Sequence, residues 1–517
     1  MNHRLRIIIP AFPAFNIYSR VANQTTALGP VCIASVVNKM SGWDVEVIDE
    51  NNYRKHGPLN SEGMPDHAAL QELRPASVVG FYGGLSSTVP RIYDLVAQYK
   101  KMGVLAIAGG LHFIDENIED GLRNGLDVIV MGEGEDTVRE CLPVLVSGGS
   151  LKEIAGLAFL DNDSVCITPP RPPIEDFDKY PIPDFSLLRY AKINIFPVSW
   201  GRGCGMNCEF CAVKGKARYA TAERLLEQFM SAAERWSATL FFIVDDLFGQ
   251  DREQALRFCK MLKEYQGKIN KKFFVTAQIR LDKAKDPELL QAMRDAGVGV
   301  VAIGFESPIP EELTAMNKHL KPEDMIEMTK VFHRLGFLIH GMFIFGYPLP
   351  PEIKFKMSAM ERVYHFKQFI KKAHIDTIQV LLAIPLPGTE LTRRLKEDKR
   401  IFSRDYLGWQ YYDGNFPLYM PEDPLTPEET LMAVKKITGS FYRFKEIFAV
   451  GFHTISFPVL VFWLHNLKSG WNRWYRQWRN SVRRFGGWVL FRHWLSQFKN
   501  DNFIQKLSDA QKNKKDQ

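Results

Sequence analysis

Three cysteines, Cys204, Cys208 and Cys211, lie close together in the segment GRGCGMNCEFCAVKG, residues 201–215. A structural zinc site takes four closed ligands, commonly two pairs of Cys or His at short spacing, and no second pair follows this segment at the usual distance. A cubic 4Fe-4S cluster is normally held by four cysteines, so a set of three leaves one iron open to a substrate or cofactor. The polar, glycine-rich segment therefore favours an iron-sulfur cluster over zinc, and over three cysteines that are close by chance.

The elements around this segment alternate between apolar runs and helical patterns, with helices expected over 221–236 and 252–265. Such alternation predicts a parallel sheet, and six strands predict a partial (β/α)6 barrel of the TIM-barrel type, whose chemistry lies at the carboxyl ends of the strands. The apolar runs are NIFPVSW, TLFFIVDD, FFVTAQIR, VGVVAIGFES, FLIHGMFIFG and TIQVLLAIP. The cysteine segment follows the first of them, which places it at the reactive end of the barrel.

The C-x3-C-x2-C pattern, with Phe210 just before its third cysteine and a βα series around it, resembles the signature of radical S-adenosylmethionine (SAM) enzymes over roughly residues 195–390. The resemblance implies that Cys204, Cys208 and Cys211 are the catalytic metal ligands and that SAM chelates the open iron. It also implies that the reduced cluster splits SAM into methionine and a 5′-deoxyadenosyl radical, with an electron donor such as flavodoxin or ferredoxin. The protein then binds, orients and excludes water.

The same resemblance implies SAM-binding residues at the later strand ends. Asp245 and Asp246 are expected near the SAM amino group, although carboxylates at such positions also cap helices. Arg280 and Glu306 are expected at the SAM carboxylate and ribose, with a plain Arg-Glu ion pair as the alternative. Glycine in the fifth strand permits close approach of the adenine. The expected SAM-binding residues are Phe210, Asp245, Asp246, Arg280, Glu306, Gly341 and Gly346.

Residues 1 to about 150 show a second alternation of apolar runs and helical patterns, with helices expected over 28–40 and 91–101. This pattern predicts a doubly wound, Rossmann-type parallel sheet, whose ligands bind at the carboxyl ends of the strands. A single glycine pair at a strand end forms a tight turn as often as it borders a ligand site. Glycines at three successive strand ends favour a ligand crevice. The expected crevice residues are Gly83, Gly84, Gly109, Gly110, Glu133 and Gly134.

Three stretches of this region, ALGPVCIASVVNK, GGLHF and VMGEGEDTV, resemble the cobalamin-binding domain that precedes the barrel in one large radical SAM subgroup. The resemblance implies cobalamin as a third cofactor. The Asp-x-His-x-x-Gly motif that gives cobalt a histidine in many cobalamin proteins is absent. Members of this subgroup often lack that histidine, so its absence changes the expected cobalt coordination without excluding cobalamin.

The C-terminal region has an apolar run over 447–464 without Lys, Arg, Asp or Glu, near the lower length limit for a bilayer span. Residues 468–499 hold eight Lys or Arg and no Asp or Glu, which accounts for the net charge of +7. Tryptophan and arginine at helical spacing predict a helix at the headgroup level of an anionic membrane, with an aromatic cap packed on the barrel as the alternative. No nucleic-acid partner is expected, because no RNA-binding module accompanies the basic patch. The residues concerned are Trp471, Trp474, Trp478, Val482 and Phe485, with Arg473, Arg476, Arg483 and Arg484 largely elsewhere around the helix.

The predicted organisation has five parts, separated by composition and by a proline-rich linker. Seven cysteines, without a disulfide-like spacing or a secretory signal, predict a reducing cytoplasm. The tail predicts that the protein is peripheral on the inner face of the cell membrane. The parts are 1–150, a cobalamin-binding-like domain; 151–190, a hairpin and linker; 191–395, the radical SAM barrel; 396–446, an extension; and 447–517, a membrane-associated helical tail.

The resemblance and the tail together predict an enzyme that uses a 5′-deoxyadenosyl radical to functionalise an unactivated carbon. We expect cobalamin-dependent C-methylation of a hydrophobic or lipid-like substrate. Radical C–C bond formation, cyclisation or rearrangement is the alternative within the same class. A non-catalytic, membrane-attached cobalamin or iron-sulfur sensor is the alternative of another class.

Overall fold

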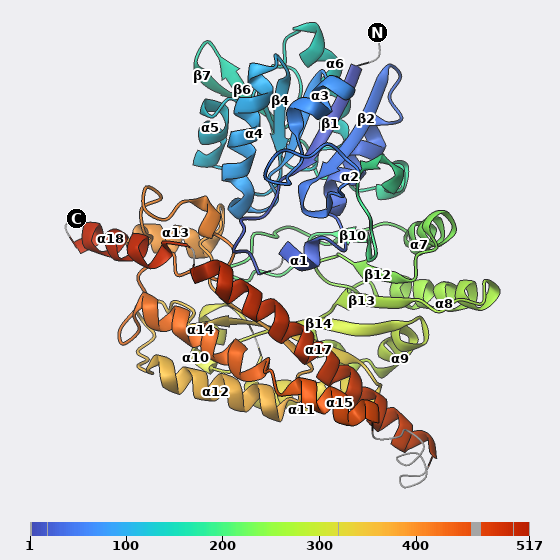
Figure 1. Ribbon diagram of the computed structural model, residues 1–517, viewed down its shortest axis with the longest axis vertical. Coiled ribbons are helices and arrows are strands. Elements are labelled where there is room, and N and C mark those ends of the chain that lie inside the picture. The colour runs from blue at the N-terminus through green and yellow to red at the C-terminus, as the bar shows by residue number, and fades with distance from the viewer. Residues whose placement is uncertain (1–2, 18, 319, 456–466, 500, 516–517) are drawn as a thin grey trace.

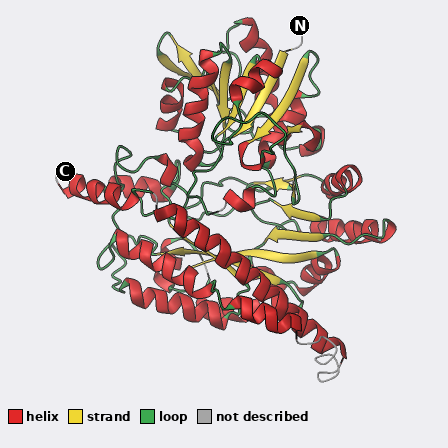
Figure 2. Cartoon of the chain, in the orientation of Figure 1, coloured by secondary structure: helices red, strands yellow, loops and turns green. Residues whose placement is uncertain are grey.

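The computed structural model describes residues 3–17, 19–318, 320–455, 467–499 and 501–515. Two β-sheets with helices around them form the molecule, the N-terminal sheet in the upper part of Figure 1 and the second sheet in the lower part. Figure 2 shows that helices dominate the C-terminal part. The predicted α/β class, with a Rossmann-type sheet, a partial barrel and a helical C-terminal region, is confirmed.

The N-terminal sheet has eight strands in the order β7-β6-β5-β4-β3-β1-β2-β8. The strands from β2 to β5 are mutually parallel, and the predicted hairpin, β6 and β7, extends the sheet antiparallel. The order 2-1-3-4-5 is the doubly wound, flavodoxin-like one, which brings several strand ends to one ligand-binding edge. The strands are β1 (His3–Ile9), β2 (Trp43–Asp49), β3 (Val78–Tyr82), β4 (Leu105–Gly109), β5 (Val128–Val130), β6 (Leu157–Asp161), β7 (Ser164–Ile167) and β8 (Leu188–Arg189).

Helices connect these strands and cover both faces of the sheet (Figure 1). Their start and end residues lie close to those expected for 28–40 and 91–101. They are α1 (Ser19–Ala22), α2 (Leu28–Val37), α3 (His67–Leu73), α4 (Val89–Lys101), α5 (Glu116–Arg123) and α6 (Glu135–Ser147), with short 3-10 turns η1 (Glu50–Asn52), η2 (Ser86–Thr88), η3 (Phe177–Lys179) and η4 (Phe185–Leu187).

The second sheet has six parallel strands in the order β16-β15-β14-β13-β12-β9, so each strand pairs with its neighbour in the barrel series. All six predicted strands are present. Between β9 and β12 a short antiparallel pair, β10 and β11, frames the cysteine segment. The strands are β9 (Phe196–Val198), β10 (Gly201–Arg202), β11 (Arg218–Tyr219), β12 (Leu240–Ile243), β13 (Phe274–Gln278), β14 (Val298–Glu306), β15 (Leu338–Phe345) and β16 (Thr377–Leu382).

Several barrel helices begin at side chains that accept hydrogen bonds from the first turn. Thr221 caps α7 and Asp251 caps α8, which explains why these two helices were predictable to within a few residues. The helices are α7 (Ala222–Trp236), α8 (Arg252–Lys268), α9 (Pro287–Asp295), α10 (Pro310–Ala315), α11 (Pro322–Arg334), α12 (Ala359–Lys372) and α13 (Glu390–Glu397), with 3-10 turns η5 (Leu281–Lys285) and η6 (Trp409–Tyr411).

The C-terminal region consists of α14 (Pro427–Phe441), α15 (Glu446–Ile455), α17 (Leu467–Lys499) and α18 (Phe503–Lys515). In Figure 1, α17 runs diagonally past α14 and α15. No helix within the described residues is long and apolar enough to cross a membrane. The first part of the predicted apolar run forms α15, whereas residues 456–464 of that run lie outside the described residues.

The position of α17 corrects one prediction about the tail. Arg476 donates to the backbone carbonyls of His333 and Phe337, at 2.9 and 3.4 Å, and Arg484 donates to that of Ile375 at 3.3 Å. The expectation that these two arginines face a membrane is therefore wrong, because their guanidinium groups satisfy carbonyls next to β15 and β16. The alternative, a helical cap on the barrel, describes this part of α17. The side chains of Trp471 and Arg473 lie outside the described part of the chain.

Candidate active site

The cysteine loop, residues 203–217, connects β10 to β11 at the carboxyl end of β9. Three glycines in it, Gly203, Gly205 and Gly215, have positive φ values of 82°, 70° and 87°, a conformation that favours glycine. The Gly205 N–H donates to the Gly215 carbonyl at 3.0 Å and closes the loop. A side chain at Gly203 would lie 2.6 Å from the Lys216 carbonyl oxygen, so the turn requires glycine there.

The thiols of Cys204, Cys208 and Cys211 are partly buried on this loop. Burial raises the pKa of Cys204 and of Cys211, and the neighbouring thiols raise both further. The Val213 N–H lies 3.4 Å from the Cys211 sulfur, the kind of donor that stabilises a metal-bound thiolate. Within the described residues no three His, Cys, Asp or Glu side chains form a preformed metal-ligand group. The donors nevertheless fit an iron-sulfur cluster, because three soft ligands share one glycine-rich loop.

The other cysteines have different surroundings. Cys141 and Cys259 are buried in the hydrophobic cores, and burial raises the pKa of each thiol to about 12. Cys32 lies in a small pocket between the two sheets, where burial raises its pKa to about 12 as well. Cys166 lies on β7, away from the loop. Their positions in the cores, in the small pocket and on β7, apart from the cysteine loop, suit packing and not ligation of the cluster.

A buried carboxylate between two of the cysteines fixes the loop to the barrel. Glu209 accepts hydrogen bonds from Arg394 at 2.7 and 3.0 Å and from the Tyr347 hydroxyl at 2.6 Å. Phe210 packs edge-on against the Tyr347 ring, with centroids 6.1 Å apart. We call Glu209, Arg394 and Tyr347 the loop anchor. No sequence pattern predicted this anchor, although the charge of Glu209 between Cys208 and Phe210 indicates that a partner must hold it.

The two aspartates after β12 have different environments. Asp245 is buried, and its Oδ1 atom accepts from the Ser199 hydroxyl and the Trp200 N–H, both at 2.8 Å, and from the Gly201 N–H at 3.1 Å. Burial raises its pKa to about 6 in spite of these donors. Asp246 is closer to the cysteines, whose pKa values it raises, and burial raises its own pKa. Asp245 thus ties β9 and β10 to β12, and Asp246 alone faces the loop.

Arg280 and Glu306 do not pair with each other. Arg280 pairs with Asp282 at 2.8 Å and contacts the sulfur of Met206 on the cysteine loop. Glu306 pairs with Lys318 at 2.9 Å, in a strained backbone conformation with φ of 60°. The alternative of a plain Arg-Glu ion pair is therefore wrong.

Lys318 was not singled out from the sequence, and it brings a third charged group toward the cysteines. Burial works to lower its pKa, but Glu306 and the Cys208 thiol outweigh burial and raise it.

The two glycines of the fifth strand act differently from each other. A side chain at Gly341 would lie 2.9 Å from atoms of Ile375 and Phe343, which belong to the core on the helix side of the sheet. Gly346, at the end of β15, has a positive φ of 63° and makes the turn toward the loop anchor. Packing therefore explains why residue 341 is a glycine. Contact of Gly341 or Gly346 with adenine stays a prediction.

The N-terminal sheet has a cavity of about 590 Å³ at the carboxyl ends of its parallel strands. Apolar side chains of β1, α2, β4 and β5 form its walls, so it fits the flat, largely apolar part of a large cofactor. Four of the predicted crevice residues, Gly109, Gly110, Glu133 and Gly134, line it. Gly83 and Gly84 are not part of this lining. A side chain at Gly110 would lie 2.5 Å from the Gly83 backbone, so these glycines allow two strand ends to approach closely.

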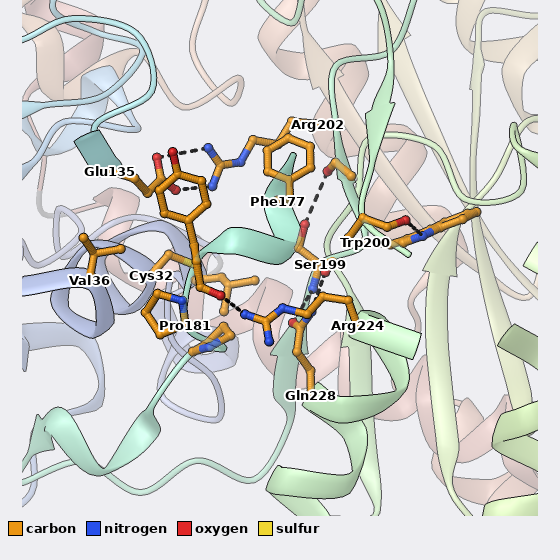
Figure 3. Close-up of a pocket in the computed structure, with 15 residues that line it drawn as sticks. Cys32, Val36, Glu135, Phe177, Pro181, Ser199, Trp200, Arg202, Arg224 and Gln228 are labelled. Carbon is orange, nitrogen blue, oxygen red and sulfur yellow. Dashed lines mark hydrogen bonds and ion pairs between the residues drawn. The ribbon is translucent and has the colours of Figure 1, made fainter. Parts of the chain in front are cut away.

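Four charged residues join this cavity to the cysteine loop, and we call them the interdomain clamp: Glu133, Glu135, Arg202 and Arg218. Arg218 donates to both oxygens of Glu133 at 2.9 and 3.0 Å. Arg202 pairs with Glu135 (Figure 3). Arg202 also lies 3.4 Å from Glu133. The Phe177 ring lies against both guanidinium groups, at 5.1 and 5.5 Å. Because Arg202 and Arg218 flank the loop and Glu133 lines the cavity, the two sites share one set of contacts.

Comparison with known proteins agrees with this geometry. The family model of the radical SAM superfamily matches residues 198–355, and that of the B12 binding domain matches residues 17–142. An uncharacterized methyltransferase of Pyrococcus horikoshii, PH0819, is 28% identical over 455 residues, which cover 85% of this chain and 92% of that protein. The bacteriochlorophyllide d C-8(2)-methyltransferase of Chlorobaculum tepidum is 26% identical over 430 residues, 78% of this chain and 83% of that protein.

Among solved structures, the cobalamin-dependent SAM radical enzyme OxsB with aqua-cobalamin and SAM bound matches with a TM-score of 0.65. The identity is 15%, and the match covers 99% of this chain and 83% of that one, so it shows a shared fold. The cysteine loop at the reactive end of the barrel and the glycine-edged cavity fall within the two matched domains. The chain therefore carries a radical SAM domain preceded by a B12 binding domain, and its cofactors are a 4Fe-4S cluster, SAM and cobalamin.

Proposed function

We propose that this enzyme methylates an unactivated carbon, with cobalamin as the methyl carrier. The observation that carries the proposal is the interdomain clamp, in which Glu133 lines the cavity of the N-terminal sheet and holds Arg218 beside the cysteine loop. A reaction that needs hydrogen removal at one cofactor and methyl delivery from another requires the two sites to keep a fixed distance. The curated relatives that are methyltransferases support the same reaction.

The proposed ligands of the cluster are Cys204, Cys208 and Cys211. We assign SAM binding to Asp246, Arg280 and Glu306. Asp246 faces the cysteine loop, Arg280 contacts Met206 on that loop, and Glu306 pairs with Lys318, which lies toward the cysteines. Asp245 has the positioning task of tying β9 and β10 to β12. The backbone of β15 near Gly341 and Gly346 is the proposed adenine contact, and the glycines lining the cavity hold cobalamin.

When bound, the cluster and SAM supply an oxidant that takes a hydrogen atom from carbon, and cobalamin supplies the methyl group. The chain positions both and excludes water from the space between them. Overall, the substrate loses one hydrogen and gains one methyl group. One SAM yields methionine and 5′-deoxyadenosine, and a second SAM yields S-adenosylhomocysteine as it replaces the transferred methyl group. Each turnover would take two electrons from a reductant such as flavodoxin.

The balance of products tests the reaction type. Reconstituted enzyme with reductant, SAM and an extract containing the substrate should form 5′-deoxyadenosine and S-adenosylhomocysteine in equal amounts. Formation of 5′-deoxyadenosine alone would favour C–C bond formation, cyclisation or rearrangement. Neither product, with cluster and cobalamin both bound, would favour a sensor.

We further propose a hydrophobic or lipid-like substrate and peripheral attachment to the inner face of the cell membrane. Phe448, Phe452 and Ile455 recur along α15, and 69%, 69% and 75% of their surfaces are exposed. Cationic Arg443 and Lys445 come just before α15, so an apolar strip and positive charge are adjacent, as an anionic membrane surface requires. The strip also continues in sequence into the apolar residues 456–464.

A further inference from the structure

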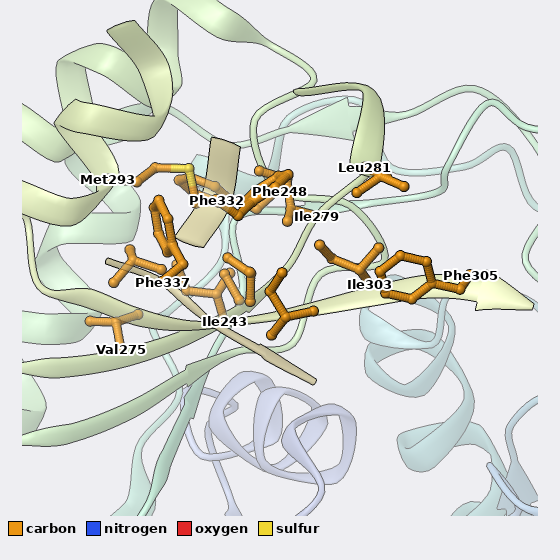
Figure 4. Packing of buried hydrophobic residues seen from close by; sticks show 14 of the residues in the cluster. Ile243, Phe248, Val275, Ile279, Leu281, Met293, Ile303, Phe305, Phe332 and Phe337 are labelled. Atoms are coloured by element: carbon orange, nitrogen blue, oxygen red, sulfur yellow. The ribbon is translucent and has the colours of Figure 1, made fainter. Parts of the chain in front are cut away.

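The interior of the barrel carries polar groups among apolar ones, unlike its helix-facing side. Figure 4 shows the helix side, where side chains such as Val275 and Ile303 pack in the main hydrophobic core. Because side chains alternate along a strand, the neighbouring residues point into the barrel. They line a cavity of about 340 Å³, with Thr276, Gln278 and His340 among its polar groups. A cavity for a purely hydrocarbon ligand would not need these polar groups.

The cavity extends along β13 from the amino end of the barrel toward the cysteine loop. Gln278 lies at its upper end and donates to the Asp246 backbone carbonyl at 2.8 Å. Phe274 lies at the beginning of the same strand, and four residues of rise in a parallel strand span about 13 Å. A ligand in this cavity can therefore have one end beside the proposed SAM site and the other end near the base of the barrel.

The base of the cavity is positively charged. Arg483 of α17 lines the cavity, and the guanidinium groups of Arg479 and Arg483 lie 5.4 and 6.0 Å from the centre of the Phe274 ring. Burial and the charge of Arg479 lower the pKa of Arg483 to about 10. Burial lowers the pKa of the nearby Arg294, and the charges of Arg479 and Arg476 lower it further, so like charges lie close together at this end.

Within the described residues neither Arg479 nor Arg483 forms an ion pair or donates a hydrogen bond, and both make ring contacts. One carboxylate, that of Asp376, lines the same cavity and acts on Arg483; its oxygens accept from the Ile339 N–H at 2.8 Å and from Asn480 at 2.6 Å. One negative charge therefore faces two guanidinium groups at this end of the cavity. A partly buried cation without a partner is costly, so this arrangement is explained if a ligand supplies the negative charge.

We propose that Arg483, assisted by Arg479, binds an anionic group at the base of the barrel. The ligand is an amphiphile with a phosphate or carboxylate at one end and a carbon chain or ring system that reaches past His340 to Gln278. This inference rests on the proposed function and specifies its substrate class: a hydrophobic skeleton that carries an anionic group remote from the methylated carbon. Burial lowers the pKa of His340 to about 4, so its imidazole is neutral and leaves recognition of charge to the arginines.

Binding of decyl phosphate to the full-length holoenzyme, measured by calorimetry below the micelle concentration, tests the proposal. We expect Arg483→Met to weaken binding at least tenfold and Arg483→Lys to weaken it less. Arg492→Met, at an exposed position on the same helix, is the matched control and should bind as the wild type does. Equal affinity of the wild type and Arg483→Met for decyl phosphate would overturn the proposal.

Two further probes separate the sources of the anion. Decanol should bind more weakly than decyl phosphate and without dependence on Arg483; equal affinity of the two would contradict recognition of charge. Inorganic phosphate should bind much more weakly than decyl phosphate, and equal affinity would identify a site for a free anion and overturn the assignment to substrate.

Thermal unfolding covers the case in which a variant folds poorly. Without added anion, Arg483→Met should melt at the wild-type temperature or higher, because the unpaired charge is gone. Decyl phosphate should raise the melting temperature of the wild type and not that of the variant. A variant that melts lower but is still stabilised by decyl phosphate would also overturn the proposal. These measurements do not depend on methyl transfer, so the failure of this inference and that of the proposed function are distinguishable.

Discussion

The loop anchor gives a prediction whose size follows from the structure. Arg394 on α13 makes two charge-assisted hydrogen bonds to Glu209, and the two side chains are only 15% and 11% exposed. Arg394→Met removes both bonds and leaves Glu209 partly buried with the Tyr347 hydroxyl as its remaining side-chain donor. A hydrogen bond to a charged group contributes about 1.5–3 kcal/mol to the free energy of unfolding, so two such bonds contribute about 3–6 kcal/mol. Because both side chains keep some access to solvent, we take the lower half of this range. We therefore expect a loss of about 3–4.5 kcal/mol.

The neighbouring Arg393 is a matched control. It pairs with Glu390 and Glu397 on the surface of the same helix, where all three side chains are more than half exposed. Exposed pairs contribute about 0–1 kcal/mol, so Arg393→Met should change little. The assays are thermal unfolding and bound iron per chain after anaerobic reconstitution. Arg394→Met should melt at least 5 °C lower, at about 2–4 °C per kcal/mol, and should hold less iron. If the two variants behave alike, the loop anchor does not position the cysteine loop and the reasoning is refuted.

Four further predictions concern the cofactor sites, the acid-base behaviour and the surface. Cys208→Ala should lose the visible absorbance of the cluster and SAM cleavage together; retained cleavage would refute the ligand assignment. Gly110→Trp should lose cobalamin, seen by its visible spectrum, while it keeps iron, because Gly110 lines the cavity of the N-terminal sheet and the cysteine loop belongs to the barrel. Burial raises the pKa of Asp413 to about 7, so the cost of its charged form to stability grows between about pH 4 and pH 7. In denaturant unfolding, Asp413→Asn should therefore be more stable than the wild type at pH 8 and not at pH 4. An equal gain in stability at both pH values would contradict the raised pKa. Replacement of Phe448 and Phe452 by Ser should reduce sedimentation with anionic vesicles, and unchanged sedimentation would exclude α15 as the contact.

The fold was predictable because its signals are local. Each barrel strand is an apolar run of typical length, and residues such as Thr221 and Asp251 define helix starts by hydrogen bonds within one turn. The cysteine spacing is local as well, and the cluster site that it predicts lies on a loop at the carboxyl end of β9. The glycines at the ends of β4 and β5 also lie where a doubly wound sheet requires them.

The contacts that complete the sites join residues far apart in sequence. Glu209 meets Arg394, and Glu133 meets Arg218, only after the barrel and the sheet have formed. The arginines of α17 show the same limit, because helical spacing tells which side chains share a face and not what that face meets. Arg476 and Arg484 meet backbone carbonyls of the barrel, where the sequence pattern suggested lipid.

The central claim is that the protein transfers a methyl group from SAM, through cobalamin, to a carbon of its substrate. The most direct measurement uses SAM with a trideuterated methyl group, reconstituted enzyme, reductant and an extract of cells that lack the gene, followed by high-resolution mass spectrometry. We predict a labelled product that carries all three deuterium atoms and that is absent with Cys208→Ala or without cobalamin. Formation of 5′-deoxyadenosine with no labelled product, in an extract that contains the substrate, would contradict the account.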